Sequence, residues 1–313
     1  MALPEEVEAL NKAFSGHGID EKSLVSILGK WKPENRMAFR KGTPHLFIED
    51  ERQFEKWDDR RVRLLKHEFM RFKNAVVLWA MHPWERDARL AKEALKKGPH
   101  AYGLLVEIAC TRTSEELLGA RKAYHSLFDR SLEEDIVSLV DGVERKLLLA
   151  LVSAYRYEGS KVKHETAKSE AQALSAAIKA AHEKPILEDE EVIRMLATRS
   201  KPHLQAVNKH YKELYGKNLD EDLAELRLKE TVQCLCSAVA YFIQVLDAAL
   251  RFDADKNTKK ALTRVIVTRA DTDMKQIMDE YQLLYGDSLT QKIEDTTNGN
   301  FKDFLLTLIA RSG

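Results

Sequence analysis

The residues best suited to chemistry in this chain are oxygen donors in two short turns. Gly16-His17-Gly18 contains two glycines, which adopt positive φ at little cost and let a tight turn point its carbonyls inward. Residues 251–256, Arg-Phe-Asp-Ala-Asp-Lys, carry two acids, and aspartate tolerates the left-handed backbone better than most residues. Calcium takes about six to eight oxygen ligands, which turn carbonyls and a bidentate carboxylate can supply. Both turns are candidates for calcium, and for 251–256 the alternative is a polar loop with solvated acids.

Motifs of enzymatic chemistry are absent from the sequence. It has no G-x-x-x-x-G-K-[ST] phosphate loop, no C-x-x-C pair and no H-E-x-x-H. Cys234 and Cys236 are two apart on an expected helix and point in different directions, so we interpret them, like Cys110, as core residues. His203 and His210 are two helical turns apart, about 10 Å, which is too far to share one metal ion. We therefore expect no enzyme activity.

Composition indicates a globular protein without a general attraction for nucleic acid. The 313 residues are 44% hydrophobic and 32% charged, and 50 Lys and Arg balance 50 Asp and Glu, so a global basic field is absent. Three cysteines form no disulfide framework, which fits a reducing compartment. The N-terminal residues are acidic, unlike a signal peptide, and no apolar run approaches the roughly 18 to 20 residues of a membrane span. We expect a soluble cytoplasmic protein with no nucleic-acid partner.

The elements that would position these turns form a tandem repeat. Thr-Arg-Thr at 111–113, Thr-Arg-Ser at 198–200 and Thr-Arg-Ala at 268–270 are each followed by Tyr-x-x-Leu-aromatic and a closing Leu. From Arg to Tyr is twelve residues in every copy, and from Tyr to the closing Leu is eight. A repeat near seventy residues exceeds the common helix-pair unit, so each copy is expected to be a small helical bundle. The recurring arginines are interpreted as architectural.

Apolar residues recur at helical spacing along the chain, so an all-α protein is expected. One more copy lies near the N-terminus and is the first in chain order. In this copy Trp31 stands where the other copies have arginine. About ten extra residues lengthen this copy around 48–61, and the charged stretch 158–168 is expected to be a linker. No strand alternation with a hairpin turn is recognisable. We predict four modules, at residues 1–82, 83–160, 161–244 and 245–313.

These four copies, their motif and the segment 13–21 (Ala-Phe-Ser-Gly-His-Gly-Ile-Asp-Glu) together resemble the annexins. Residues 84–88, Trp-Glu-Arg-Asp-Ala, are similar to the plant branch. Both glycines of the family's G-x-G-T loop signature are kept, with Ile19 in place of the threonine. The resemblance covers the whole chain and implies five-helix repeats in a right-handed superhelix. Such a superhelix forms a curved disc that binds anionic membranes through calcium held on its convex face.

For the first copy the resemblance also implies a ligand set. The carbonyls it indicates are those of Phe14, Gly16 and Gly18. The family's carboxylate follows by a spacing that leads to Asp58, forty residues after Gly18. Alignment of 72–81 with the family's last helix leads instead to Glu68. We favour Glu68 and keep Asp58 and Asp59 as alternatives.

For the fourth copy the same alignment gives four metal-binding candidates, Arg251, Asp253, Asp255 and Asp295. Asp295 follows Asp255 by forty residues, the expected carboxylate spacing. The two loop acids raise the local negative charge. They either strengthen calcium binding or crowd it.

The second and third copies lack a plausible calcium site. Pro99 fixes φ in the loop of the second copy, and Leu139 and Leu226 occupy the two carboxylate positions. Lys96 and Lys97 either contact an anionic surface, at about 1 kcal/mol each, or form a solvated pair.

Together these features predict calcium-dependent, peripheral and reversible binding to anionic phospholipid membranes. We expect a role in calcium or stress signalling or in membrane trafficking, with the protein cytoplasmic until calcium rises. His17 adds a pH dependence, because an imidazole titrates near pH 6.5. The alternative is a calcium-independent helical scaffold that binds protein partners such as actin or another copy of itself.

Overall fold

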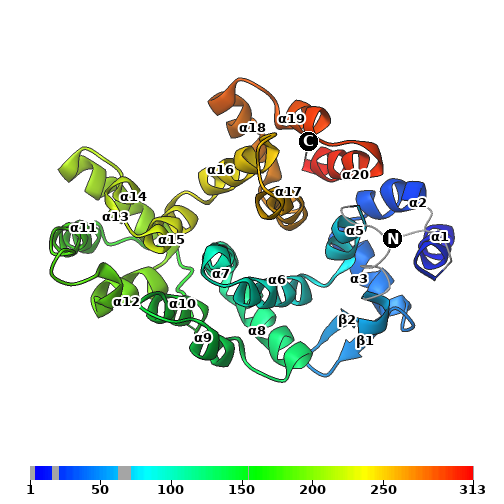
Figure 1. Ribbon diagram of the computed structural model, residues 1–313, viewed down its shortest axis with the longest axis horizontal. Coiled ribbons are helices and arrows are strands. Elements are labelled where there is room, and N and C mark those ends of the chain that lie inside the picture. Colours follow the sequence, from blue (N-terminus) through cyan, green and yellow to red (C-terminus); the bar gives the residue numbers. More distant parts are fainter. Residues whose placement is uncertain (1–3, 16–20, 63–71, 154, 313) are drawn as a thin grey trace. The chain divides into compact units, whose positions relative to one another are not determined.

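The computed structural model describes residues 4–15, 21–62, 72–153 and 155–312. The chain divides into two compact units, Met1–Pro83 with Phe242–Gly313, and Trp84–Tyr241 (Figure 1). The two ends of the sequence thus fold together as one unit, and the middle folds as the other. Within the described ranges, no helix combines the length and the apolar character needed to cross a membrane.

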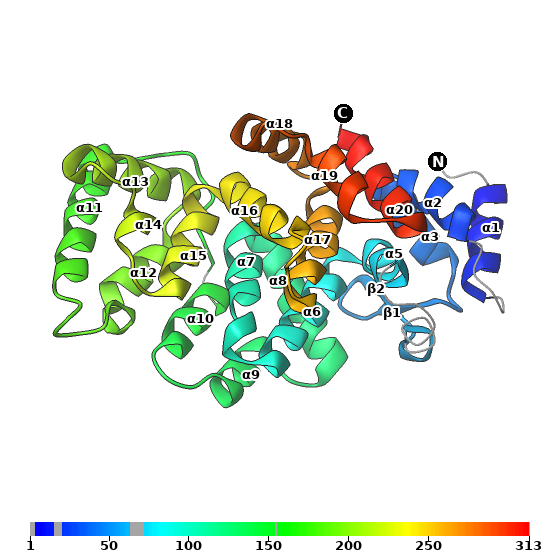
Figure 2. The same ribbon diagram turned by 45° about the horizontal axis from the view of Figure 1, so that its top comes forward.

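The unit Trp84–Tyr241 contains two successive sets of helices. The first set is α6 (Pro83–Lys97), α7 (Gly103–Thr111), α8 (Ser114–Phe128), α9 (Leu132–Leu139) and α10 (Glu144–Ser153), with a 3₁₀ turn at Pro99–Ala101. The second is α11 (His164–Lys179), α12 (Glu190–Thr198), α13 (Lys201–Tyr215), α14 (Leu219–Asp222) and α15 (Leu226–Cys236), with a 3₁₀ turn at Ile186–Glu188. Helix α11 packs along α13, and α7 packs along α15 (Figure 2).

The recurring sequence motif marks the two ends of one helix. Thr113 begins α8 with a reciprocal capping box to Glu116, and Ser200 caps α13. The same helices end at residues in the left-handed conformation, Asp129 (φ 54°) and Gly216 (φ 78°), which helps to satisfy the last helical carbonyls. Each N-cap contributes about 1 kcal/mol. In the second and third repeats the motif therefore spans one helix that is capped at both ends.

The fourth copy departs from this pattern because Ala270 has no side-chain oxygen to act as a cap. Helix α18 (Met274–Tyr285) begins later, after Asp273, whose side chain makes no capping bond. Asp273 instead pairs with the recurring Arg269, with Nε and Oδ1 2.8 Å apart.

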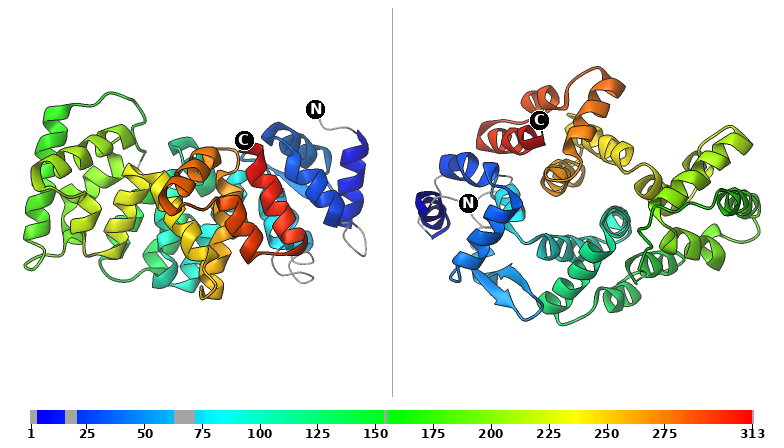
Figure 3. Two further views of the ribbon diagram at one scale, coloured as in Figure 1. Left: turned by 90° about the horizontal axis from the view of Figure 1, so that it is seen from above. Right: turned by 180° about the vertical axis from the view of Figure 1, so that it is seen from behind.

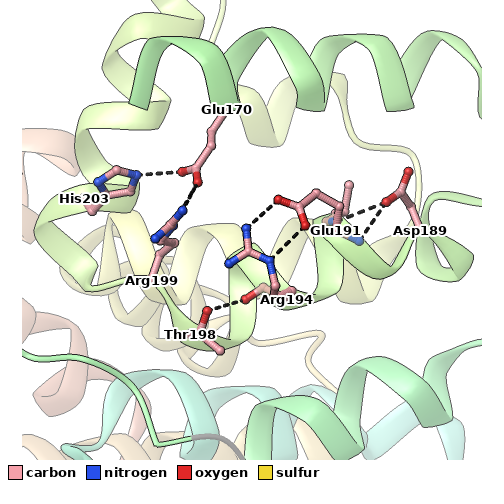
Figure 4. A network of polar contacts seen from close by, with 8 residues as sticks. Glu170, Asp189, Glu191, Arg194, Thr198, Arg199 and His203 are labelled. Carbon is pink, nitrogen blue, oxygen red and sulfur yellow. Dashed lines mark hydrogen bonds and ion pairs between the residues drawn. The ribbon is translucent and has the colours of Figure 1, made fainter. Parts of the chain in front are cut away.

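The recurring tyrosines and arginines make polar contacts that hold the helices of each repeat. Each tyrosine is buried and donates its hydroxyl to an aspartate, in the pairs Tyr124–Asp135, Tyr211–Asp222 and Tyr281–Asp247. Arg199 Nε and Nη2 donate to Oε1 of Glu170 over 2.8 and 2.6 Å, and Oε2 of Glu170 lies 2.6 Å from Nε2 of His203 (Figure 4). One buried carboxylate thus joins α11 to both ends of the turn between α12 and α13.

The other unit begins with α1 (Pro4–Ser15), α2 (Glu21–Ser26), a 3₁₀ turn (Leu28–Lys30), α3 (Pro33–Gly42) and α5 (Phe72–Ala80). It continues with α16 (Ala238–Leu250), from Phe242 onward, α17 (Lys256–Arg269), α18, α19 (Leu289–Thr296), α20 (Gly299–Ile309) and a 3₁₀ turn (Ala310–Ser312). Helix α20 packs against α2 and α5, and α17 also packs against α5. At Gly29 a Cβ would lie 3.0 Å from Thr307, so glycine permits the close approach of α20. Segments more than two hundred residues apart therefore share one core.

A β-hairpin interrupts the helices in the extra segment of the first copy. Strands β1 (Phe47–Asp50) and β2 (Phe54–Trp57) pair antiparallel, with Phe47 opposite Trp57 (Figure 3). The expectation of no hairpin was wrong here. The turn has no Gly, Pro or Asn to reveal it, and Gln53 takes the positive φ of 67°. The hairpin packs on Phe39 through its aromatic residues. The ring centroids of Phe39 and Phe47 lie 5.9 Å apart.

The expected linker is shorter than predicted, and Arg156, just before it, contacts the neighbouring helices. Helix α11 begins at His164, inside the predicted range 158–168. Arg156 donates to the carbonyls of Leu196 and Arg199, and its own carbonyl accepts from Ser114 Oγ. Arg156 therefore caps α12 and joins it to the start of α8. Helix α16 is continuous across residues 244 and 245, and the four-module division stays a prediction.

Candidate functional site

The loop of the first repeat follows the C-terminus of α1. Phe14 is buried, and its ring centroid lies 6.1 Å from that of Phe39 and 5.4 Å from that of Trp57. Its carbonyl is among the last four of α1, which have no partner within a helix and carry the negative end of the dipole. The backbone at Phe14 is therefore anchored where a cation would be attracted. Gly16, His17, Gly18 and Glu68 lie outside the described residues.

The alternative carboxylates of the first repeat follow strand β2. Asp58 Oδ1 accepts from the backbone N–H groups of Arg60 and Arg61 over 2.8 and 3.3 Å, so it caps the chain that follows. Asp59 beside it is exposed. The choice between Glu68 and these two acids stays open.

The loop of the fourth repeat joins α16 to α17, and both of its acids have local partners. Arg251 Nε lies 3.2 Å from Asp253 Oδ1, and both side chains are mostly exposed. Asp255 is the N-cap of α17, because Oδ1 accepts from the N–H groups of Asn257 (2.7 Å) and Thr258 (3.0 Å). These hydrogen bonds lower the pKa of both carboxyls, through Arg251 for Asp253 and through the Thr258 amide first for Asp255. Both acids are thus ionised at neutral pH and already engaged.

The expectation that these aspartates replace glycine through left-handed backbone was wrong for both, because neither Asp253 nor Asp255 has a positive φ. The φ of Asp255 is −68°, because an N-cap residue takes the extended conformation. Among the described non-glycine residues, positive φ occurs at Gln53 and Asp129. The fourth loop is therefore built as a helix cap.

Two further contacts bear on the fourth loop. Lys259 Nζ donates to the carbonyl of Phe252 over 3.2 Å, which places a cation on the loop. Asp295 is exposed on α19 and accepts from Gln291 Nε2, 2.9 Å away on the same helix. In the described parts of the chain, no three Asp, Glu, His or Cys side chains gather as a metal centre. A site built from turn carbonyls and one carboxylate requires no such cluster.

The loops of the second repeat use their carbonyls internally. Tyr102 donates its hydroxyl to the carbonyl of Leu139 over 3.1 Å, and Arg227 Nη2 donates to the carbonyl of Pro99 over 3.1 Å. Sequence reasoning missed Arg227. The signal for it was a basic residue directly after Leu226, which occupies the carboxylate position of the third repeat. Its guanidinium takes the hydrogen-bonding role that a bound cation would have at Pro99.

The ion pair between Asp87 and Arg112 also belongs to the framework. It is buried and bidentate, with distances of 2.7 and 2.9 Å, and it joins α6 to the end of α7. Burial opposes ionisation of Arg112, but the charge and hydrogen bonds of Asp87 outweigh it and raise the pKa of the guanidinium. The Arg112 guanidinium therefore stays charged at every physiological pH.

The helix order, the capped motif and the loop positions agree with comparisons with known proteins. Residues 86–151, 169–226 and 246–308 match the sequence pattern of the annexin family. The chain is an annexin. Its first repeat, with Trp31 and the hairpin, lies outside the three matches.

Full-length relatives are plant annexins, which confirms the resemblance to that branch. Annexin D4 of Arabidopsis thaliana is 55% identical, with 100% of both chains covered, and annexin Gh1 of Gossypium hirsutum is 41% identical, covering 98% of this chain and 95% of the relative. Among solved structures, annexin III has a TM-score of 0.79 and 27% identity, covering 99% of this chain and 95% of that one. Chicken annexin V, solved in complex with Zn²⁺, has a TM-score of 0.79 and 27% identity, with 99% and 97% covered. The all-α annexin fold is confirmed.

Proposed function

We propose that this annexin binds anionic phospholipid membranes, peripherally and reversibly, when calcium rises. Its membership of the annexin family over the full chain supports this function. The observation that carries the proposal is a contrast between loops. Residues 251–255 form an exposed loop with two ionised carboxylates, whereas the second repeat has protein donors on the carbonyls of Pro99 and Leu139.

The proposed ligands lie in the first and fourth repeats. The first set comprises the carbonyls of Phe14, Gly16 and Gly18 with the carboxylate of Glu68. The second comprises Arg251, through its carbonyl, with Asp253, Asp255 and Asp295. Lipid phosphates and carboxyls complete each coordination shell, so membrane and metal reinforce each other as linked ligands.

Calcium binding in the fourth repeat requires a local exchange of partners. Asp253 has to leave Arg251, and Asp255 either remains the cap of α17 or gives up that role. The cost of breaking these contacts offsets part of the attraction between calcium and the two carboxylates. We therefore expect the fourth site to be weaker than its charge suggests.

The cellular role that we propose is calcium or stress signalling or membrane trafficking, with the protein cytoplasmic at resting calcium. The reversible attachment of such a protein follows from a shared coordination shell, since neither partner alone completes it. Actin binding and self-association belong to the alternative scaffold function.

Calcium titration with phosphatidylserine vesicles tests the proposal. We expect wild type to cosediment as calcium rises, and Glu68→Gln with Asp295→Asn to lose this response while keeping its helix content. Glu183→Gln removes an exposed carboxylate of the third repeat and is expected to leave the response unchanged. In a crystal soaked with calcium, no ion should lie beside Leu139 or Leu226.

Two results would redirect the proposal. If the double variant sediments at the wild-type calcium concentration, the ligand assignment is wrong. If wild type does not respond to calcium, the scaffold function takes its place, and actin cosedimentation and solution mass become the informative measurements.

A further inference from the structure

Two histidine rings meet on neighbouring helices of the third repeat. His164 is the first residue of α11, and His210 lies in the second half of α13. Their ring centroids are 5.7 Å apart, and the ring planes are nearly perpendicular, at 85°. Neither histidine belongs to the proposed calcium ligands or to the motif that recurs between repeats. The pair is therefore a feature that the repeat framework does not explain.

The packing of the two helices brings the histidines together. Helix α11 packs along α13, and Glu170 of α11 contacts His203 of α13 (Figure 4). His164 precedes Glu170 by six residues, and His210 follows His203 by seven. Both steps are about two helical turns, so each histidine returns to the side of its helix that faces the other. Two contacts thus agree on the same antiparallel register.

One nitrogen of His210 is buried without a partner. Its Nδ1 lies 3.0 Å from Oε2 of Glu213, and its side chain is 18% exposed. A carboxylate only accepts, so Nδ1 donates the hydrogen, and Nε2 of the neutral ring carries the lone pair. Nε2 is shielded from solvent and has no hydrogen-bond partner among the described residues. Buried polar atoms normally have a partner, and a lone pair beside a second imidazole suits a metal ion.

The geometry around His210 matches that of a metal ligand. Metal-binding histidines commonly donate their other ring N–H to a carboxylate, which orients the ring, and Glu213 has that position here. With Zn–N bonds of about 2.0–2.1 Å, two imidazoles on one tetrahedral ion have ring centroids about 5 to 6 Å apart. The observed 5.7 Å lies in this range. His164 is exposed, so its ring is free to turn a nitrogen toward the ion.

The ligand type selects the metal. Imidazole nitrogen suits zinc, copper and nickel, whereas calcium and magnesium prefer oxygen. In the part of the chain that the structure describes, no three metal-binding side chains gather. Water therefore supplies the remaining ligands, as at an open zinc site, and the ion is exchangeable. Of the charged residues beside the histidines in sequence, Lys163 and Lys209 oppose a cation, and Glu165 and Glu213 favour it.

We propose that His164 and His210 together bind one late first-row divalent ion such as zinc. The ion joins the start of α11 to α13 and stabilises the third repeat. A cation that binds only the folded chain adds to its stability in proportion to its occupancy. The proposal goes beyond calcium and lipid binding and shares no residue with the proposed calcium sites, so either one can fail without the other.

Isothermal titration of the metal-free full chain with zinc, in excess magnesium at pH 7.5, tests the proposal. We expect wild type to bind one zinc ion more per chain than His164→Asn or His210→Asn. Glu213→Gln keeps both nitrogens but loses the carboxylate that orients His210, and we expect about ten-fold weaker binding. The control is His182→Asn, because His182 is an exposed histidine of the same repeat that also lies beside a carboxylate, Glu183. It should bind zinc like wild type.

Two further measurements separate metal binding from a structural role. With one equivalent of copper, electron paramagnetic resonance should show two imidazole nitrogens on the metal in wild type and one in His164→Asn. Zinc should raise the melting temperature of wild type and of His182→Asn, but not that of the two ligand variants. His164 is exposed, so His164→Asn should keep its helix content in circular dichroism.

Three results overturn the proposal. The first is equal zinc binding by wild type and His164→Asn, and the second is a single nitrogen on copper in wild type. The third is an equal loss of zinc from His182→Asn and His164→Asn, which would show unspecific binding by surface histidines. If His210→Asn loses helix content, His164→Asn decides by itself, because its side chain is not part of the core.

Discussion

Asp271 joins both ends of the unit Met1–Pro83 with Phe242–Gly313, and its removal tests how that unit is held. Its carboxylate lies 2.6 Å from Arg36 and 2.6 Å from the near-terminal Arg311. The Arg36 side chain is 8% exposed, its guanidinium lies 3.6 Å from the Trp79 ring centroid, and burial lowers its pKa to about 10. In Asp271→Asn this buried cation loses its counter-charge.

Removing one partner of a buried ion pair costs about 3 to 5 kcal/mol. The Asp271 side chain is 23% exposed, so water partly replaces it, and we expect the lower end, about 3 kcal/mol. For a unit of this size that loss lowers the melting temperature by roughly 10 °C. Urea unfolding followed by circular dichroism at pH 7 without calcium measures the change. Asp287→Asn breaks an exposed pair with Lys292 in the same unit and should have no measurable effect.

The pH dependence gives a sharper check of the same contact. Burial opposes ionisation of Asp271, but Arg36 and Arg311 outweigh it and lower the pKa of the carboxyl. The pair therefore contributes its full stability above the unfolded pKa of about 4 and loses it as pH falls through the lower folded value. The difference between wild type and Asp271→Asn should stay constant from pH 8 to 5 and shrink below pH 4. Equal stability at pH 7, or a difference that grows in acid, would refute the account.

Three further predictions concern the interior and the first loop. Asp87→Asn leaves the buried Arg112 without its partner and should lower the free energy of unfolding by about 3 kcal/mol. The calcium concentration at half-maximal vesicle binding should not change. A change in that concentration would mean that the pair takes part in calcium binding. Burial raises the pKa of the Cys110 thiol to about 11, so this thiol should react with a disulfide reagent at pH 8 only after unfolding, and rapid labelling of the native protein would contradict its burial. At limiting calcium, binding to anionic vesicles should strengthen from pH 7.5 to 6 as His17 protonates, and His17→Ala should flatten this profile; identical profiles would remove His17 from the account.

Much of the local structure could be predicted because its causes lie close together in the sequence. The constant spacings between Arg, Tyr and Leu are visible in the amino-acid sequence alone, and they correspond to one helix with a cap at each end. The helix caps contact backbone groups only a few residues away, so residue type and spacing suffice to detect them. Examples are Thr113, Asp129 and Gly216. The lack of a carboxylate at Leu139 and Leu226 was equally readable. The family and the all-α class followed from these local features.

What the tertiary structure decided depends on residues that are distant in the sequence. No spacing rule could show that α20 packs on α2, that Arg36 meets Asp271, or that the hairpin at 47–57 forms against Phe39. The same holds for Arg227, which donates a hydrogen bond to the carbonyl of Pro99. Gly98 and Pro99 by themselves do not show that this carbonyl is already engaged by a protein donor. A cap satisfies its own helix, whereas a buried ion pair or an occupied carbonyl needs a partner that only folding brings near. Sequence therefore determined the repeats and their candidate ligands, and packing decided which loop oxygens are already used.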